Sequence, residues 1–583
     1  MLRASSLGPN DDRIAPLQPP LTRYNFMEYL FCWLLATAVV NADGIPSTMR
    51  WSDQTYGPDG PWHAVSVELG SNNQVIDLYP GDRWASTILI DTVCADNASA
   101  PCYADRAGLF NISDSTSAVT LNTPTDTSQM TWLSDQSSAG VNKWGATGYV
   151  KEGVLADTIT LQNSHKIPNI SMVSIYDAYQ EYPNGKRYPV SVGILSLGGP
   201  WPTHVVDGNT FNLLCAWEHW NESSLHAIPS YSWGMHIGSV DLEIPGSLML
   251  GGYDQSRVLG QVSTQQVDAT NNFGSLEIYL KDIGIGVATG NSPFAFENKT
   301  GLFRWGNSTT SRAKTVVIDP TLPYLYLPQD TCDAMAADLP VTFNEGLGLY
   351  FWNTDDENYK KITSSPTYLS FTFENAATTE NITIKVPFPL LKLTLQAPLV
   401  EHNTTYFPCY PSDSFILGRA FLQAAFIGTN WQEGIGAGYW FLAQAPGPAI
   451  GSSNLQSIET SNTSLKASAN PWEETWDGSW VPLSSKSSNS GLSTGAKAGI
   501  GIGCAIGGLG LIGLIVWVII SRQKETTNPH SRAVGGYSIA PNPVEVADSL
   551  PVSELNTHHL SELQSDKGIQ EVPGATAARH ELL

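Results

Sequence analysis

One aspartate of the sequence stands where it could take part in acid–base chemistry. Asp319 follows the apolar run VVI in the stretch VVIDPTLPYLYLPQDT (316–331), so a buried strand is expected to end at this residue. A carboxyl group held in this way can exchange a proton when a second carboxyl group lies close to it. The sequence therefore raises the question whether Asp319 belongs to a working catalytic pair or to the remnant of one.

The elements that would hold such a pair are predicted to be strands. From about 63 to 445 the chain shows short alternating runs, such as HAVSVELG and YLSFTFEN, broken by Gly, Pro, Asn and Asp. Helical patterns are few, and the clearest lie around 332–339 and 420–426. We therefore expect an all-β fold. Because the stretch is too long for one sandwich, we expect two β lobes.

The composition is typical of an extracellular β-rich protein. Charged residues make up 14% of the 583 residues, whereas Gly, Pro and aromatic residues are frequent. The formal net charge of -24 argues against nucleic acid as a partner, because phosphate binding needs clustered Lys and Arg.

An apolar segment near the start predicts a signal peptide. Tyr29–Val40 has about the length of a signal-peptide core, and Val40-Asn41-Ala42 has the small residues of a cleavage site. The segment lies far from Met1. Either Met27 is the true start, or the segment stays uncleaved as an anchor.

A second apolar segment, Ala498–Ile520, is long enough to cross a bilayer as a helix. Arg522 and Lys524 follow it, so the positive-inside rule puts the tail in the cytoplasm. We expect a single-pass type I protein of the plasma membrane or secretory pathway, with its ectodomain extracellular or lumenal. Three small residues at four-residue spacing could let two such helices dimerise: Gly499, Gly503 and Gly507.

The 7 cysteines are consistent with an oxidising compartment. Two of them fall in the apolar segments. Of the other five, Cys94 with Cys102 would close a short loop, and Cys332 with Cys409 a long one. Cys215 then remains as a buried free thiol or as one half of an intermolecular bridge.

Acceptor motifs for N-glycosylation support the same topology, because all nine lie between the two apolar segments. They are Asn97, Asn111, Asn169, Asn221, Asn298, Asn307, Asn381, Asn403 and Asn462.

Four stretches, in this order, resemble segments of the pepsin-like aspartic proteases (peptidase A1-like). They are VGILSLG (192–198), GSLMLGGYD (246–254), VVIDPTLPYLYLPQD (316–330) and SFILGRAFLQAAFIG (414–428). The resemblance covers nearly the whole region between the apolar segments and is closest to membrane-tethered acid-protease-like proteins of fungi. It implies a bilobal, all-β acid protease fold with a substrate cleft between the lobes, here joined to one transmembrane helix.

Together these features predict six regions. They are an N-terminal extension with the signal peptide (1–42), an N-terminal β lobe (43–255), a C-terminal β lobe (256–445), a Ser/Asn-rich stalk (446–497), the transmembrane helix (498–520) and a disordered cytoplasmic tail (521–583). The stalk contains Trp472, Trp476 and Trp480, which we expect to pack back onto the ectodomain because a solvated stalk has no use for them.

The resemblance implies two catalytic aspartates, each in an Asp-Thr/Ser-Gly motif, that share a proton. Asp319 matches the second position, but its neighbours do not. Pro320 stands where a supporting hydroxyl belongs, Thr321 replaces the glycine, and Leu322 removes the next hydroxyl. Three departures in a row are expected to degrade the motif.

The first catalytic position allows three interpretations. An ungapped alignment from the turn at 70–74 to Cys94 puts Gly81 in the position, and we favour this interpretation, in which the first carboxylate is lost. A slip of one residue would put Asp82 there. Alternatively, Asp91 is catalytic after a deletion, because Asp91-Thr92 looks like a damaged motif.

The flap that closes the cleft in this family corresponds here to NKWGATGYVKEG, with Trp144-Gly145 at or near the position of the family's flap tyrosine. Tyr149 would serve after a register shift.

We predict neither a metal nor a cofactor. The histidines considered as ligands, His219, His226 and His236, do not have the spacing of a metal site. The favoured function is a non-catalytic pseudoprotease whose cleft binds an extended peptide or another cell-surface ligand. The alternatives are a membrane-tethered aspartic endopeptidase active at acidic pH, and a glycoprotein with a structural role.

Overall fold

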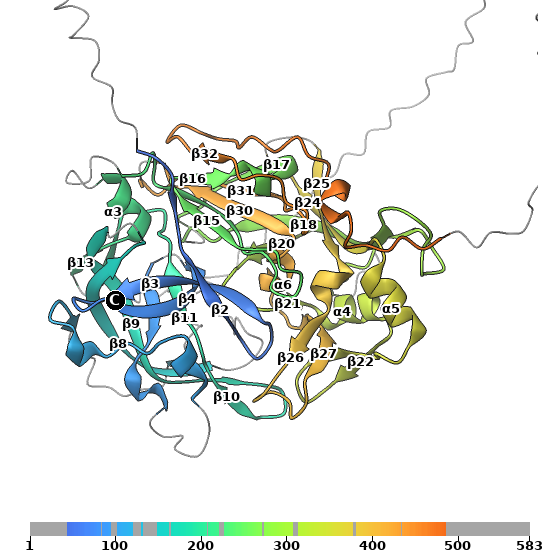
Figure 1. The fold of residues 1–583 in the computed structure, drawn as a ribbon, viewed down its shortest axis with the longest axis horizontal. Helices are drawn as coiled ribbons and strands as arrows, with labels where there is room; N and C mark the ends of the chain where they lie inside the picture. Colours follow the sequence, from blue (N-terminus) through green and yellow to red (C-terminus); the bar gives the residue numbers. More distant parts are fainter. Residues whose placement is uncertain are drawn as a thin grey trace, which may run out of the picture. The chain divides into compact units, whose positions relative to one another are not determined.

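Strands dominate the structure, and their burial follows the alternation of the sequence. In the strand WHAVSVEL (β3, Trp62–Leu69), buried positions include Trp62, Ala64, Val67 and Leu69, which pack into the core. The computed structural model describes residues 44–484, apart from 83, 95–101, 121–129, 132–147, 163–164, 207, 221–226, 271–272, 307–312, 377–379 and 433 (Figure 1). The predicted all-β character is confirmed for this part of the chain.

The largest sheet takes its strands from the first half of this region and has the order β12-β13-β9-β5-β11-β4-β3-β8-β6, with β2, β7 and β10 attached to its members. Its strands are β2 (Trp51–Tyr56), β3, β4 (Gln74–Asp82), β5 (Ser86–Leu89), β6 (Val119–Thr120), β7 (Met130–Thr131), β8 (Gly148–Thr160), β9 (Lys166–Glu181), β10 (Arg187–Pro189), β11 (Gly193–Ser196), β12 (Thr203–Val206) and β13 (Asn209–Asn212).

A six-stranded sheet joins strands that lie far apart in the sequence, in the order β1-β15-β14-β30-β31-β17. Figure 1 shows β30 and β31 next to β15 and β17. Its strands are β1 (Ser47–Thr48), β14 (Ser232–His236), β15 (Ser247–Leu250), β17 (Leu259–Gln266), β30 (Ala425–Asn430) and β31 (Tyr439–Gln444), and the adjoining strands β16 (Gly252–Asp254) and β32 (Leu455–Ser457) pair separately.

The remaining strands form an eight-stranded and a four-stranded sheet. The first contains β18 (Glu277–Val287), β19 (Asn298–Lys299), β20 (Lys314–Ile318), β21 (Leu325–Leu327), β24 (Thr367–Glu374), β25 (Asn381–Pro387), β28 (Cys409–Pro411) and β29 (Ile416–Leu417). The second contains β22 (Val341–Asn344), β23 (Leu349–Trp352), β26 (Leu393–Leu395) and β27 (Thr404–Phe407). The α-helices that the structure describes are short: α3 (Leu214–Trp220), α4 (Gln329–Ala336), α5 (Glu357–Ser364) and α6 (Arg419–Leu422).

The expected bilobal pepsin-like fold is wrong. One hydrophobic core runs from Met49 to Trp480 and takes residues from both halves of the sequence. The six-stranded sheet likewise pairs β14 with β30, so strands of the two expected lobes belong to the same layer. The described residues accordingly belong to one compact unit. The alternating pattern predicted the strand-rich character and the two short helices near 332 and 420, but it did not predict α3, α5 or the assembly of the strands, because pairing between distant strands leaves no local signal.

Among the described residues, the expected transmembrane helix is not found either. In the part of the chain that the structure describes, no helix is both long and apolar enough to cross a membrane. The segments Tyr29–Val40 and Ala498–Ile520, and with them Gly499, Gly503 and Gly507, lie outside the described residues.

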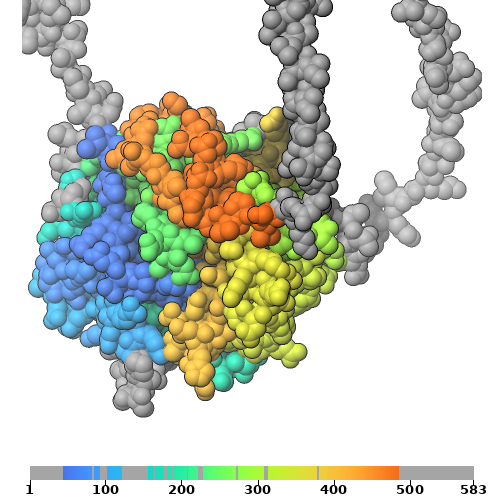
Figure 2. All heavy atoms as spheres, turned by 45° about the vertical axis from the view of Figure 1, so that its right-hand side comes forward, coloured from blue at the N-terminus to red at the C-terminus, as the bar shows by residue number. Residues whose placement is uncertain are grey.

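The segment after 445, expected as a stalk, packs onto the rest of the unit as far as Ser484 (Figure 2, orange). Trp476 is 1% exposed and stacks on Trp480, with ring centroids 4.9 Å apart and planes at 11°. Trp472 is also buried, and Lys385 lies over its ring. The prediction that these three tryptophans pack back onto the ectodomain is confirmed.

The cysteines agree in part with the expected pairing. Cys332 of α4 and Cys409 of β28 form the predicted disulfide. Cys102 is disulfide-bonded as well, whereas the side chain of Cys94 lies outside the described residues. Cys215 on α3 is a buried free thiol, one of the two alternatives expected for it.

Candidate functional site

Asp319 lies at the end of β20, where the backbone leaves the eight-stranded sheet. Its amide donates to Leu417 O on β29 at 3.1 Å, so the loop starts from a fixed point of the sheet. Asp319 is buried, with 8% of its surface exposed. The backbone amide of Thr321 (2.9 Å) and its hydroxyl (2.6 Å) both donate to Asp319 Oδ1. Thr321, which the sequence marked as a disruptive replacement, therefore holds the aspartate in its own turn.

Gly81, the favoured occupant of the first catalytic position, lies against Pro320. Its backbone has a φ of 135°, which side-chain-bearing residues rarely adopt. A Cβ atom built on Gly81 would come within 2.1 Å of Pro320 Cγ. No carboxylate-bearing side chain fits at position 81 while Pro320 keeps its place.

The two alternative partners occupy other places. Asp82 is the last residue of β4, and its side chain lies outside the described residues. Asp91 begins the 3-10 helix Asp91–Cys94 after β5, and it is exposed. It does not line the cavity of about 30 Å³ that Gly81, Asp319 and Thr321 share, which is roughly enough for one water molecule.

An arginine that the sequence analysis did not single out occupies the centre of this region. Arg419 begins α6 and is 5% exposed. Its Nη1 donates to the carbonyl oxygens of Pro320 (3.2 Å) and Thr321 (2.8 Å), so it ties α6 to the Asp319 loop. The guanidinium lies over the rings of Tyr79 (4.2 Å) and Trp62 (5.1 Å). The sequence did contain a signal, because Arg419 is the one charged residue inside the apolar run SFILGRAFLQAAFIG. A charged residue that is buried with such a run needs partners.

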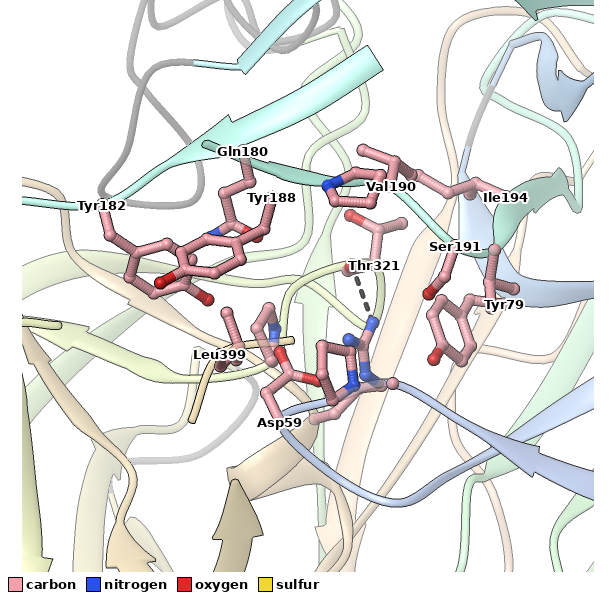
Figure 3. A pocket seen from close by; sticks show the side chains of 16 residues that line it. Asp59, Tyr79, Gln180, Tyr182, Tyr188, Val190, Ser191, Ile194, Thr321 and Leu399 are labelled. Carbon is pink, nitrogen blue, oxygen red and sulfur yellow. Dashed lines mark hydrogen bonds between the residues drawn. The ribbon is translucent and has the colours of Figure 1, made fainter. Parts of the chain in front are cut away.

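Beside Arg419 lies a cavity of about 60 Å³ (Figure 3). Tyr79, Gln180, Asp59 and Arg419 line it together with tyrosine, proline and aliphatic side chains. Three buried polar atoms at this cavity have no hydrogen-bond partner among the described residues: Tyr79 Oη, Gln180 Nε2 and Arg419 Nε.

Asp59, Tyr79 and Tyr182, which line this cavity, are buried. Asp59 is 7% exposed, and its Oδ1 accepts a hydrogen bond from Trp62 Nε1 at 3.0 Å. Burial raises the pKa of Tyr79, and the neighbouring Arg419 only partly offsets that effect. The pKa of Tyr182 is raised well above its ordinary value, mainly by burial and then by the charge of Asp59. Both tyrosines therefore stay neutral and keep their hydroxyl protons in the physiological range.

A larger cavity of about 340 Å³ adjoins the first one. The two cavities share the wall residues Gly57, Pro58, Pro189 and Ser191, and we call them together the Arg419 groove. The outer part is lined by Tyr56 and Tyr103, by Arg106 and by prolines. Arg106 is exposed, and its guanidinium lies 5.9 Å from the centroid of the Tyr56 ring.

The other predicted site residues lie elsewhere or cannot be placed. Trp144 and Gly145 lie outside the described residues, and of Tyr149 only the backbone, in β8, is described. His236 is buried, with Nε2 2.9 Å from Gln423 O, so it has a structural role. His226 is not described. In the described part of the chain, no three His, Cys, Asp or Glu side chains gather as metal ligands do.

The glycosylation motifs that the structure describes fall into two groups. Asn169, Asn298, Asn381 and Asn403 are exposed. Asn111 and Asn462 are half-buried, and each accepts a backbone hydrogen bond through its side chain, from Ser113 and Glu459. Asn97, Asn221 and Asn307 lie outside the described residues.

Comparison with known proteins adds no assignment to this geometry. No protein-family model matches the chain, and no curated protein sequence matches it at a significant level.

Proposed function

We propose that this chain is a non-catalytic relative of the aspartic proteases that binds an extended peptide in the Arg419 groove. The observation that carries the proposal is the groove itself, two cavities of about 60 and 340 Å³ that share wall residues, the smaller of which is also lined by Thr321 of the Asp319 loop. Its walls are tyrosines and prolines with a few charged or polar groups, which is the usual make-up of a site for a flexible ligand.

The contact between Gly81 and Pro320 supports the non-catalytic part of the proposal. Acid proteolysis needs two carboxyl groups that share a proton across the site. Position 81 has no room for one, and Arg419 places a guanidinium next to the Asp319 loop. A cation in that place favours the charged form of any nearby carboxylate, whereas a proton-sharing pair needs one neutral member.

The disulfide between Cys332 and Cys409 and the exposed glycosylation motifs support a place in the secretory pathway, with the groove facing the extracellular or lumenal side. Peptides presented there would be segments of other surface or secreted proteins.

The test combines a cleavage assay with a binding assay on the purified full-length chain. An unfolded protein substrate is incubated with it between about pH 3 and 6, with and without an aspartic-protease inhibitor. In parallel, the chain is applied to an array of random decapeptides. We expect no inhibitor-sensitive cleavage and reproducible capture of a subset of peptides.

Ser191→Trp provides the variant, because Ser191 lines both cavities and an indole there would fill the groove. Val75→Trp is the matched control, since Val75 is 59% exposed on β4 and lines neither cavity. Loss of capture in S191W alone supports the groove. Inhibitor-sensitive cleavage would overturn the non-catalytic assignment, and capture unchanged in S191W would overturn the groove as the binding site.

A further inference from the structure

We infer that the cavity beside Arg419 recognises a primary carboxamide, the head group of an asparagine or glutamine side chain. The inference rests on the proposed function, because the rest of the peptide would lie in the outer part of the Arg419 groove. It specifies which peptides the groove selects.

The unpartnered polar atoms show that this cavity is built for a polar guest. Tyr79 is 7% and Arg419 5% exposed, yet Tyr79 Oη and Arg419 Nε lack hydrogen-bond partners among the described residues, and so does Gln180 Nε2. A buried polar group left unpaired destabilises a protein by roughly 1–3 kcal/mol. Three such atoms on the residues that line one cavity therefore offer hydrogen-bond partners to a polar guest. Two of them are N–H donors, so the guest must offer an acceptor.

The charges of the cavity select a neutral guest. Arg419 and Asp59 both line it. Their charges balance, so a bound carboxylate would add a second negative charge beside Asp59, and an ammonium a second positive charge beside Arg419. In a site shielded from water, such like-charge contacts are strongly unfavourable.

A carboxamide satisfies both sides of the cavity at once. Its carbonyl oxygen can accept from Arg419 Nε or Gln180 Nε2. Its NH₂ group can donate to the carboxylate of Asp59, where Oδ1 already accepts from Trp62 and Oδ2 remains. The Tyr79 hydroxyl can serve either side, because a neutral phenol both donates and accepts.

The size of the cavity agrees with this guest. A volume of about 60 Å³ corresponds to roughly two water molecules at about 30 Å³ each. The three heavy atoms of a carboxamide head need about that much room, whereas an aromatic ring or a long charged chain needs more. Small apolar groups would fit, but they would leave the three polar atoms unpaired.

The experiment uses host peptides with one variable central residue, Asn, Gln, Asp or Leu, within an otherwise constant Ala/Thr/Val sequence. The peptides end in an N-methylamide, because an ordinary C-terminal amide is itself a primary carboxamide. Dissociation constants for the full-length chain come from fluorescence anisotropy. We expect the Asn or the Gln peptide to bind at least about tenfold more tightly than the Asp and Leu peptides, the effect of one well-made buried polar contact. The difference in dissociation constant between the Asn and the Gln peptide then shows how deep the carboxamide site lies.

Two variants test whether residues of this cavity produce the preference for a carboxamide. Tyr79→Phe removes only the hydroxyl, and Gln180→Met keeps the length of the side chain without its amide. Each should reduce the preference for carboxamide to within about twofold of Leu. Tyr326→Phe is the matched control, because the Tyr326 hydroxyl is also buried without a partner but does not line this cavity.

The outcomes separate this inference from the proposed function. If all four peptides bind equally, or the Asp peptide binds best, the carboxamide assignment is overturned while peptide binding stands. A preference that survives both Y79F and Q180M would also overturn it.

A last experiment compares the binding of propionamide and propionate by ligand-observed NMR. If no peptide binds but propionamide does, and Y79F abolishes that signal, the carboxamide site stands and the peptide function fails. If neither a peptide nor propionamide binds, both fail.

Discussion

Gly81 and Pro320 touch across the candidate site, at the two positions where the family resemblance puts the first catalytic aspartate and the residue after the second. A Cβ on Gly81 would lie 2.1 Å from Pro320 Cγ, which is closer than non-bonded atoms can approach. The residues at these two positions are thus fitted to each other. The ring of Pro320 fills space that only a glycine at 81 leaves open.

Restoring an aspartate at position 81 should therefore destabilise the protein rather than activate it. We expect Gly81→Asp to lower the free energy of unfolding by about 2–4 kcal/mol, from the overlap with Pro320 and from the positive φ of 135°. Urea denaturation measures this change. Gly185→Asp is the control, because Gly185 also has a positive φ, 73°, but nothing lies within 4 Å of its added Cβ. Equal losses in the two variants would show that the contact with Pro320 does not matter.

Replacing Arg419 by lysine should also be costly, although the charge is kept. A lysine ammonium has no planar group to lie over the rings of Tyr79 and Trp62 while it donates to the carbonyl oxygens of Pro320 and Thr321. We expect Arg419→Lys to lower the free energy of unfolding by about 2–3 kcal/mol in chemical denaturation. Arg304→Lys, at an exposed position, should change it by less than about 0.5 kcal/mol. A similarly small effect at 419 would contradict the role assigned to the guanidinium.

Acid should destabilise the fold through His236. Burial, reinforced by the charge of Arg257, lowers the pKa of His236 to about 3, whereas its pKa in the unfolded chain is about 6.5. Below pH 6.5 the His236 imidazole is protonated in the unfolded chain, whereas it stays neutral in the folded chain. The stability contributed by the neutral imidazole is thus complete above pH 6.5 and is lost as the pH falls toward 3. Between pH 6.5 and 5.5 the expected loss from this residue is about 1 kcal/mol.

His236→Gln tests this linkage, since a glutamine amide can still donate to Gln423 O, which lies 2.9 Å from His236 Nε2. The variant should show a smaller fall in unfolding free energy between pH 6.5 and 5.5 than the parent chain. His402→Gln, at an exposed position, serves as the control. An unchanged slope in H236Q would mean that other groups carry the acid sensitivity.

Truncating Trp476 should loosen the segment after 445. Trp476 is 1% exposed and stacks on Trp480, so Trp476→Ala removes a large buried ring. We expect a loss of about 3–5 kcal/mol in unfolding free energy and faster proteolysis between 446 and 484. Val481→Ala, at a residue that is 65% exposed, should leave both unchanged. Cleavage of the parent chain as rapid as that of W476A would show that the segment is not held by this contact.

The sequence predicted elements well wherever the information was local. Alternating runs such as WHAVSVEL became strands with the expected buried face, and the apolar run before Asp319 became β20. The long-range Cys332–Cys409 bridge and the buried tryptophans were also predictable, because each cysteine of this chain has few possible partners and tryptophan is usually well buried. The assembly into one unit was not predictable, since the pairing of β14 with β30 joins residues almost 200 positions apart (232–235 with 427–430).

By itself, then, the sequence determined the all-β character and the absence of an Asp-Thr/Ser-Gly motif, at Asp319 or elsewhere in the chain. Only the tertiary structure decided what surrounds Asp319 and Gly81. Neither the fit of Pro320 against Gly81 nor the cavity with Tyr79, Gln180, Asp59 and Arg419 has a sequence pattern, because these residues come from separate strands and loops. Their roles arise from packing, which removes water, leaves particular polar atoms unpaired and thereby defines what can bind.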